Sequence, residues 1–290
     1  MLIRYGYEVT FQCAVDTPVI ARVNVHPDRA RDVMSEIPFM STPVVQSVVF
    51  NDAFGNLARR FVAPPGTTTI SGEGVIKDWG QPDPAWPGAT EWAIQDLPAE
   101  VLPYLLGSRY CETDLLTPLA WQLFGTTAPG WNRVQAICNY VHNHIAFNYQ
   151  FARSTRTALE VHQERVGVCR DFAHLAIAFC RCLNIPARYV NGFLGDIGVP
   201  ADPAPMDFSA WIEVFIGGQW HTFDARHNVS RIGRIVIARG RDAMDVPIIH
   251  SFGTHSLQRF KVITEEVTGQ NAPQMQSQQM LGSHQQLRAA

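Results

Sequence analysis

A cysteine follows a glycine and opens an apolar-periodic segment at residues 167–175, GVCRDFAHL. The pattern predicts a helix that begins at Cys169 and ends near Asn184, with Pro186 just beyond it. The N-terminus of a helix carries unsatisfied N–H groups and a partial positive charge, which favour a thiolate and can hold a developing oxyanion. Cys169 is therefore a candidate nucleophile. The alternative is a core residue, because free cysteine is among the most buried residue types.

A β-hairpin is predicted at residues 209–226, SAWIEVFIGGQWHTFDAR. Its two alternating runs meet at a Gly-Gly pair, a two-residue turn in which both positions need positive φ. This register pairs Phe215 with Trp220 and places position 209 diagonally from Asp224 on one face. A histidine at position 209 would be oriented by Asp224 and could present its other nitrogen to the thiol. The residue there is Ser209.

These two segments carry a family resemblance. Residues 167–195, GVCRDFAHLAIAFCRCLNIPARYVNGFLG, and residues 206–225, MDFSAWIEVFIGGQWHTFDA, resemble the bacterial transglutaminase-like superfamily, whose members are usually described as cysteine proteases. The family order is a cysteine on a helix, a histidine before Ala-Trp, and an aspartate at a Phe-Asp-Pro or Phe-Asp-Ala end. Carried over by position, Cys169 matches the nucleophile, Asp224 matches the orienting acid, and Ser209 takes the place of the histidine.

The serine at this position removes the usual base, since a hydroxyl is too short and too weakly basic to carry the thiol proton to a leaving amine. His174 points away from Cys169 on the predicted helix, and His221 falls on the opposite, mainly apolar face of the hairpin. His227 lies beyond the strand, where a loop could fold it back over the site. His227 is the candidate substitute base, and the alternative is that it only holds the loop.

Two further residues are candidates for substrate binding. Arg226, opposite Ser209 in the predicted register, could pair with Asp224 or attract an anionic substrate group; the alternative is an ordinary surface ion pair. Trp211 could lie at the edge of the cleft, although packing of the hairpin is the more ordinary role for its ring. Asp171, in the first helical turn, complements the helix dipole rather than performing chemistry.

The surrounding elements predict an α+β fold. Residues 1–96 alternate as strands and end in the Pro-rich stretch DWGQPDPAWPGATEW, which indicates an all-β, sandwich-like N-terminal domain. Residues 97–267 run from helical patterns into strands after Pro186. Together with the resemblance, this predicts a papain/transglutaminase-like core in which the helix bearing Cys169 packs on an antiparallel sheet. Residues 268–290 are polar and Gln-rich, and we expect a disordered tail.

Composition narrows the function classes. The 290 residues carry a formal net charge of −3 with charges of both signs mixed along the chain, so nucleic acid is not an expected partner. No segment reads as a membrane span or as a signal for export, and we expect a cytoplasmic protein with reduced thiols. The cysteines lack zinc-site spacing and no metal or cofactor motif is visible, so neither group is expected; the six are Cys13, Cys111, Cys138, Cys169, Cys180 and Cys182.

The resemblance implies a thiol hydrolase or acyltransferase that acts on amide bonds of peptide or protein substrates, with Cys169 and Asp224 in its site. A catalytically degenerate binding or scaffold protein is the alternative, and Ser209 is its direct support. A third hypothesis gives the N-terminal sheet domain a role in recruiting another protein, although no sequence feature there names the partner.

Overall fold

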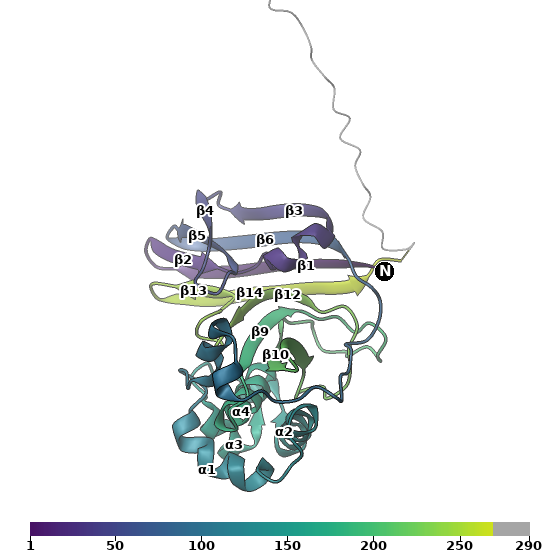
Figure 1. Ribbon diagram of the computed structural model, residues 1–290. Helices are drawn as coiled ribbons and strands as arrows, with labels where there is room; N and C mark the ends of the chain where they lie inside the picture. Colours follow the sequence, from purple (N-terminus) through teal and green to yellow (C-terminus); the bar gives the residue numbers. More distant parts are fainter. Residues whose placement is uncertain (269–290) are drawn as a thin grey trace, which may run out of the picture.

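The structure, a computed structural model, describes residues 1–268 and has the α+β architecture that the sequence predicts (Figure 1). The N-terminal region is all β apart from the 3₁₀ turn η1 (Pro27–Asp32). Its strands are β1 (Leu2–Cys13), β2 (Thr17–Ala21), β3 (Val33–Thr42), β4 (Ser47–Asn51), β5 (Leu57–Ala63) and β6 (Gly66–Lys77). The sequence expectation for the tail beyond residue 268 concerns residues outside the described part of the chain.

The N-terminal strands form two four-stranded antiparallel sheets, and each sheet takes one strand from the far end of the chain. One sheet has the order β14-β1-β6-β3 and the other β13-β2-β5-β4, where β13 is Ile249–Ser251 and β14 is His255–Glu266. β14 covers the edge that β1 would otherwise expose, pairing Ile3 with Glu266 through Cys13 with His255. The observed pairing therefore differs from a division of the chain at residue 96, because residues 249–266 complete the N-terminal sheets.

The second part of the molecule places helices against a central antiparallel sheet of order β11-β10-β9-β12 (Figure 1). Its α-helices are α1 (Thr113–Phe124), α2 (Trp131–His144), α3 (Ala158–Glu164) and α4 (Cys169–Cys182). Its 3₁₀ turns are η2 (Ile94–Asp96), η3 (Ala99–Leu105) and η4 (Tyr149–Phe151). Its strands are β7 (Ala146–Phe147), β8 (Val166–Gly167), β9 (Ala187–Phe193), β10 (Ser209–Ile216), β11 (Gln219–Phe223) and β12 (Ile235–Gly240).

Helix α4 is the centre of this second part, and it begins at Cys169 as the sequence predicts. Every residue of α4 other than Arg170 is buried, because the helix packs on β9 and β10 and on the other three helices. Its first turn is fixed by Asp171, whose Oδ2 accepts the Val168 N–H at 2.9 Å and Nη1 of Arg156 at 3.1 Å. The position of the first helical residue is thus held by both packing and hydrogen bonds.

The hairpin β10–β11 has the predicted register. Phe215 pairs with Trp220, and the turn residues Gly217 and Gly218 have φ values of 61° and 81°. The ladder ends at Phe223, so the chain is free to leave the sheet at the next residue.

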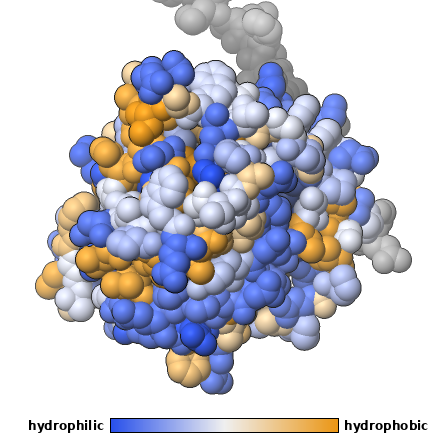
Figure 2. All heavy atoms as spheres, turned by 60° about the horizontal axis from the view of Figure 1, so that its bottom comes forward, coloured by the Kyte–Doolittle hydropathy of each residue, from blue (hydrophilic) through white to orange (hydrophobic). Residues whose placement is uncertain are grey.

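The surface of the helical part is mixed rather than continuously apolar. Figure 2, which brings the bottom of the Figure 1 view forward, shows apolar patches separated by hydrophilic side chains. Within residues 1–268, no helix combines the length and the apolar character that a membrane crossing requires.

A buried asparagine joins the two parts of the molecule. Asn56 lies in the turn between β4 and β5, is fully buried, and exchanges two hydrogen bonds of 2.8 Å with the backbone of Arg239 on β12. Its Nδ2 also lies 3.1 Å from both carboxylate oxygens of Asp52, which in turn accepts Nε of Arg22 at 2.9 Å. These hydrogen bonds attach the N-terminal sheets to the central sheet, and both the nitrogen and the oxygen of the Asn56 side chain have partners.

We predict that Asn56→Ala lowers the free energy of unfolding by about 2 to 3 kcal/mol, since the Arg239 backbone groups lose their partners inside the protein. Denaturant unfolding of the purified variant measures the loss. Asn51→Ala, at an exposed position of the neighbouring strand β4, is the control and should change stability by less than about 0.5 kcal/mol. An Asn56 variant as stable as the parent would show that this contact does not hold the two parts together.

Candidate active site

The carboxylate of Asp224 occupies the first position after β11 and has four hydrogen-bond donors. Oδ2 accepts Nδ1 of His227 at 2.8 Å and Nη2 of Arg234 at 2.9 Å, while Oδ1 accepts the backbone N–H groups of Arg226 and His227 at 3.0 Å each. Burial alone would raise the pKa of Asp224, but the Arg234 charge and the His227 hydrogen bonds hold it well below its usual range. Asp224 is thus a permanent anion that fixes the loop after the hairpin.

His227 is folded back by this loop onto the wall of a small pocket. The pocket has a volume of about 60 Å³ and is also lined by Ser209, Asp207 and Arg226. Nδ1 of His227 is held by Asp224, and no group within residues 1–268 hydrogen-bonds to its Nε2. The side chain is 21% exposed. The pairing with an aspartate through Nδ1 leaves Nε2 as the nitrogen that can exchange a proton in the pocket.

Ser209, at the start of β10, is buried and does not replace the missing imidazole. Its Oγ has no hydrogen-bond partner among the described residues, and Asp224 is already occupied by other donors. The next residue, Ala210, directs its backbone N–H to the sulfur of Cys169. The backbone between residues 209 and 210 therefore approaches the thiol, and the interaction with Asp224 is made by His227.

Cys169 lies at the first position of α4 and is 8% exposed. Its sulfur accepts the N–H groups of Ala210 and Arg170, which lower the thiol pKa, as does the Arg226 charge. Burial and the negative charge of Asp207 outweigh them and raise the pKa of Cys169 to about 11. The N–H group at the helix start thus favours the thiolate, but burial and Asp207 outweigh it, so the thiol needs a base at neutral pH.

A second carboxyl group, Asp207, lies at the site and was not among the sequence candidates. It comes two residues before Ser209 and accepts hydrogen bonds from the Phe208 N–H and the Tyr149 hydroxyl. Burial raises the pKa of Asp207 to about 6, although Arg226 and the two hydrogen bonds oppose the shift. The only sequence signal is an acid just upstream of the family histidine position; the burial and the contact with Tyr149 come from the fold.

The two candidate substrate-binding residues have different positions. Arg226 lines the pocket near the thiol, with its guanidinium 3.9 Å from the centre of the Phe147 ring. Its side chain does not pair with Asp224, which takes Arg234 instead. Trp211 is buried in a cluster with Val190 and Val236, and the Arg234 guanidinium covers its ring at 4.9 Å. Of the two roles considered for Trp211, these contacts agree with packing, on the face of the sheet away from α4, and the ring does not line the pocket that contains His227.

The remaining histidines near these motifs are structural. Nε2 of His174 accepts the Ala243 N–H at 3.1 Å, and the ring stacks on Tyr110 at 5.0 Å. His221 is buried against Trp131 and Trp86. Neither ring lines the pocket that contains His227, Ser209 and Asp207. These positions agree with the helix and hairpin faces expected from the sequence.

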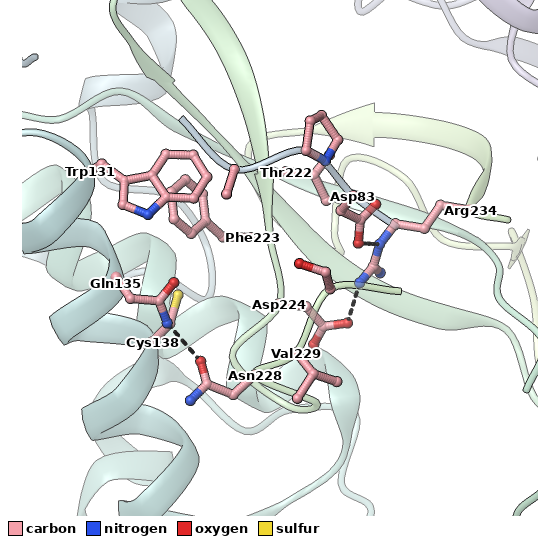
Figure 3. Close-up of a pocket in the computed structure, with 13 residues that line it drawn as sticks. Asp83, Trp131, Gln135, Cys138, Thr222, Phe223, Asp224, Asn228, Val229 and Arg234 are labelled. Atoms are coloured by element: carbon pink, nitrogen blue, oxygen red, sulfur yellow. Dashed lines mark hydrogen bonds and ion pairs between the residues drawn. The ribbon is translucent and has the colours of Figure 1, made fainter. Parts of the chain in front are cut away.

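Asp224 lines a second and larger pocket of about 170 Å³ (Figure 3). In that pocket Arg234 bridges Asp224 and Asp83, and Gln135 donates to Asn228 at 2.9 Å. Within residues 1–268, no three or more His, Cys, Asp or Glu side chains gather as a metal site would require.

Comparison with known proteins defines the class to which this fold and site belong. A family model for the transglutaminase-like superfamily matches residues 119–225, a range that includes Cys169, Ser209 and Asp224. The crystal structure of a protein from Cytophaga hutchinsonii described as a "putative cysteine protease" superposes with a TM-score of 0.77, is 30% identical, and the match covers 91% of this chain and 90% of that one. The chain belongs to the transglutaminase-like superfamily.

Two mycobacterial relatives are each described as an "uncharacterized protein". One, from Mycobacterium leprae, is 37% identical over 89 residues, which cover 30% of this chain and 31% of the relative, so the match spans about a third of that protein. The other, from Mycobacterium bovis, is 26% identical over 226 residues, 68% of each chain.

We predict that the uncharged reagent iodoacetamide alkylates Cys169 slowly at pH 7 and increasingly fast up to a pH of about 11, because only the thiolate reacts. Arg226→Gln should slow alkylation at pH 8 about 3- to 10-fold, since the Arg226 charge lowers the pKa of this thiol and one pKa unit is a factor of ten. Mass spectrometry of the Cys169 peptide at timed intervals gives the rates.

Arg259→Gln removes an equal charge from an exposed position on β14 and should leave the rate unchanged. An Arg226 variant that reacts as fast as the parent would mean that this guanidinium does not act on the sulfur.

Proposed function

We propose that this protein is a thiol hydrolase or acyltransferase that acts on amide bonds of peptide or protein substrates, with Cys169 as the nucleophile. The observation that carries the proposal is the contact of 2.8 Å between Nδ1 of His227 and Oδ2 of Asp224, because His227 lines the same pocket as Ser209. His227 thus supplies an imidazole oriented by Asp224, although the position of the family histidine holds Ser209. Membership in the superfamily supports the reaction class.

In the proposed reaction, Nε2 of His227 takes the proton from Cys169 while the sulfur attacks the carbonyl carbon of the substrate. The N–H groups at the start of α4 stabilise the negative charge that develops on the carbonyl oxygen. The amine departs, and water or an acceptor amine then cleaves the thioester, which gives hydrolysis or acyl transfer respectively. Because the thiol pKa is about 11, proton transfer to a base accompanies the attack.

The position of the imidazole supports this role for His227. Asp224 binds Nδ1, so the neutral ring carries its lone pair on Nε2, as a general base requires. Arg234 binds the same carboxylate oxygen, Oδ2, and keeps Asp224 ionised. Ser209 has a smaller side chain than an imidazole, and its buried Oγ has no hydrogen-bond partner among the described residues.

The alternative is a catalytically degenerate protein that keeps the fold and uses the cleft for binding. The protonated, largely buried thiol of Cys169 favours this alternative, as does Ser209. The two functions make opposite predictions for turnover that depends on Cys169.

We predict a burst of p-nitrophenolate from p-nitrophenyl acetate, equal to one acyl group per protein, and slow hydrolysis of fluorescently labelled casein. Cys169→Ala should abolish both, and His227→Asn should slow the burst about 10²- to 10⁴-fold, the usual contribution of a general base. Stopped-flow absorbance and casein fluorescence measure the two reactions.

His255→Asn changes an exposed histidine on β14 and should leave both rates unchanged. If neither reaction depends on Cys169, the degenerate function is the correct one.

A second-site change tests the base in a different way. Adding Ser209→His to His227→Asn should raise the burst rate at least 10-fold above that of the single variant. The new imidazole would occupy the family position, where the Asp224 oxygen that His227 had bound can accept its N–H. Absorbance at 400 nm after rapid mixing compares the single and double variants, and a double variant no faster than His227→Asn would argue against a shared role for the two positions.

A further inference from the structure

Two aspartates of the site lie in opposite electrostatic environments. Asp224 accepts four hydrogen bonds, two of them from the side chains of Arg234 and His227, and stays ionised. Among the described residues, Asp207 forms no ion pair within 4 Å. It accepts hydrogen bonds from the Tyr149 hydroxyl and the Phe208 N–H. Pairs of carboxyl groups whose environments separate their pKa values in this way commonly divide acid and base roles in enzymes.

Asp207 is also the carboxyl group that acts on the nucleophile. Its charge is the largest electrostatic contribution to the raised pKa of Cys169 after burial, whereas Asp224 acts on His227. Asp207 lines the same pocket as Ser209 and His227, and it is the second residue upstream of β10, where the strand approaches the thiol. The mechanism proposed above leaves this group without a role.

Resting on the proposed function, we propose that Asp207 is a catalytic residue of the Cys169 site: its carboxyl group protonates the departing amine and later accepts a proton from the water that cleaves the thioester. Two groups of this site then share the proton transfers that a single histidine performs in other members of the superfamily. His227 handles the proton of the sulfur, and Asp207 handles the protons of the amine and the water.

The proton balance closes over one cycle. In acylation the S–H proton moves to His227, the S–C bond forms, the C–N bond breaks, and the nitrogen takes the proton of neutral Asp207. In deacylation ionised Asp207 takes a proton from water, the new C–O bond forms, and the S–C bond breaks. The sulfur recovers its proton from protonated His227. Both groups return to their starting states, and the net reaction is the addition of water across the amide bond.

The proton needed in the first step is present in part of the population near neutral pH, because burial raises the pKa of Asp207 to about 6. A loss of the neutral form above this pH makes amide cleavage fall as pH rises through about 6. The charged and titratable groups around Asp207 come from four segments and are Tyr149 on η4, Cys169 on α4, Arg226, His227 and Arg231 after β11, and Asp196 and Asp202 on its own loop.

The leaving group distinguishes this role from a structural one. p-Nitrophenolate departs as an anion, whereas an amine has to be protonated before it can depart. Asp207→Asn should therefore leave the burst with p-nitrophenyl acetate within about 3-fold of the parent rate, but slow the steady-state release and casein hydrolysis by about 10²-fold. Asp16→Asn, which changes an exposed aspartate in the turn between β1 and β2 and outside this pocket, is the matched control and should change none of the three rates.

The pH profile gives an independent readout. The Tyr149 hydrogen bond lowers the pKa of Asp207, so Tyr149→Phe should raise that pKa and move the descending limb of kcat/KM for casein to higher pH. Asp207→Asn should remove this limb. A merely structural aspartate would change the amplitude of the profile and not the position of its limb.

The outcomes separate the two proposals. Loss of burst and steady-state rates to the same extent in Asp207→Asn, or unchanged casein hydrolysis, would overturn the role of Asp207 and leave Cys169 as the nucleophile. No burst in the parent protein would overturn the proposed function, and the inference about Asp207 with it.

Discussion

The candidate site depends on one buried charge, the carboxylate of Asp224. A buried anion is stable only when its oxygens are fully satisfied, and here two side chains and two backbone N–H groups do this. Arg234 is the main cation, and its other donor binds Asp83 in the connection between the sandwich and the helices at 2.8 Å. The interactions Asp83–Arg234–Asp224–His227 thus run from this connection to the loop that returns the imidazole to the pocket.

The rest of the molecule fixes the two ends of this arrangement. Helix α4 is buried on all sides and places the Cys169 sulfur, while the central sheet places Asp224 at the end of β11. β14 completes the sheet that contains β1, and the Asn56 contacts attach the N-terminal sheets to this core. Ser209 provides no base, but its side chain is small, and the imidazole in the same pocket comes from the loop after β11.

The start of the helix that bears Cys169 and the register of the hairpin could both be predicted from local sequence. The helix start at Cys169 follows from apolar periodicity after a glycine, and the hairpin register follows from two adjacent glycines with positive φ. These two elements also carry the family resemblance. The pairing of β14 with β1 was not readable, because it joins residues more than 240 positions apart and neither strand specifies its partner locally.

Electrostatics were the other part that local sequence could not supply. The pKa of Cys169 depends on burial and on Asp207, and the pKa of Asp207 depends on burial and on a tyrosine from a distant 3₁₀ turn. A helix N-terminus alone suggests the opposite sign for the thiol. Trp211 was similarly ambiguous: alternation places it on one face of β10, but only the packed sheet shows that this face turns away from the thiol.

The central claim is that Asp224 holds His227 with Nδ1 protonated and Nε2 free to exchange a proton. Nitrogen NMR of the protein labelled with ¹⁵N-histidine measures this directly. The account predicts that neutral His227 is the Nδ1–H form, and that Asp224→Asn shifts or broadens its Nδ1–H signal. A neutral His227 protonated on Nε2, or a signal insensitive to the change at Asp224, would contradict it.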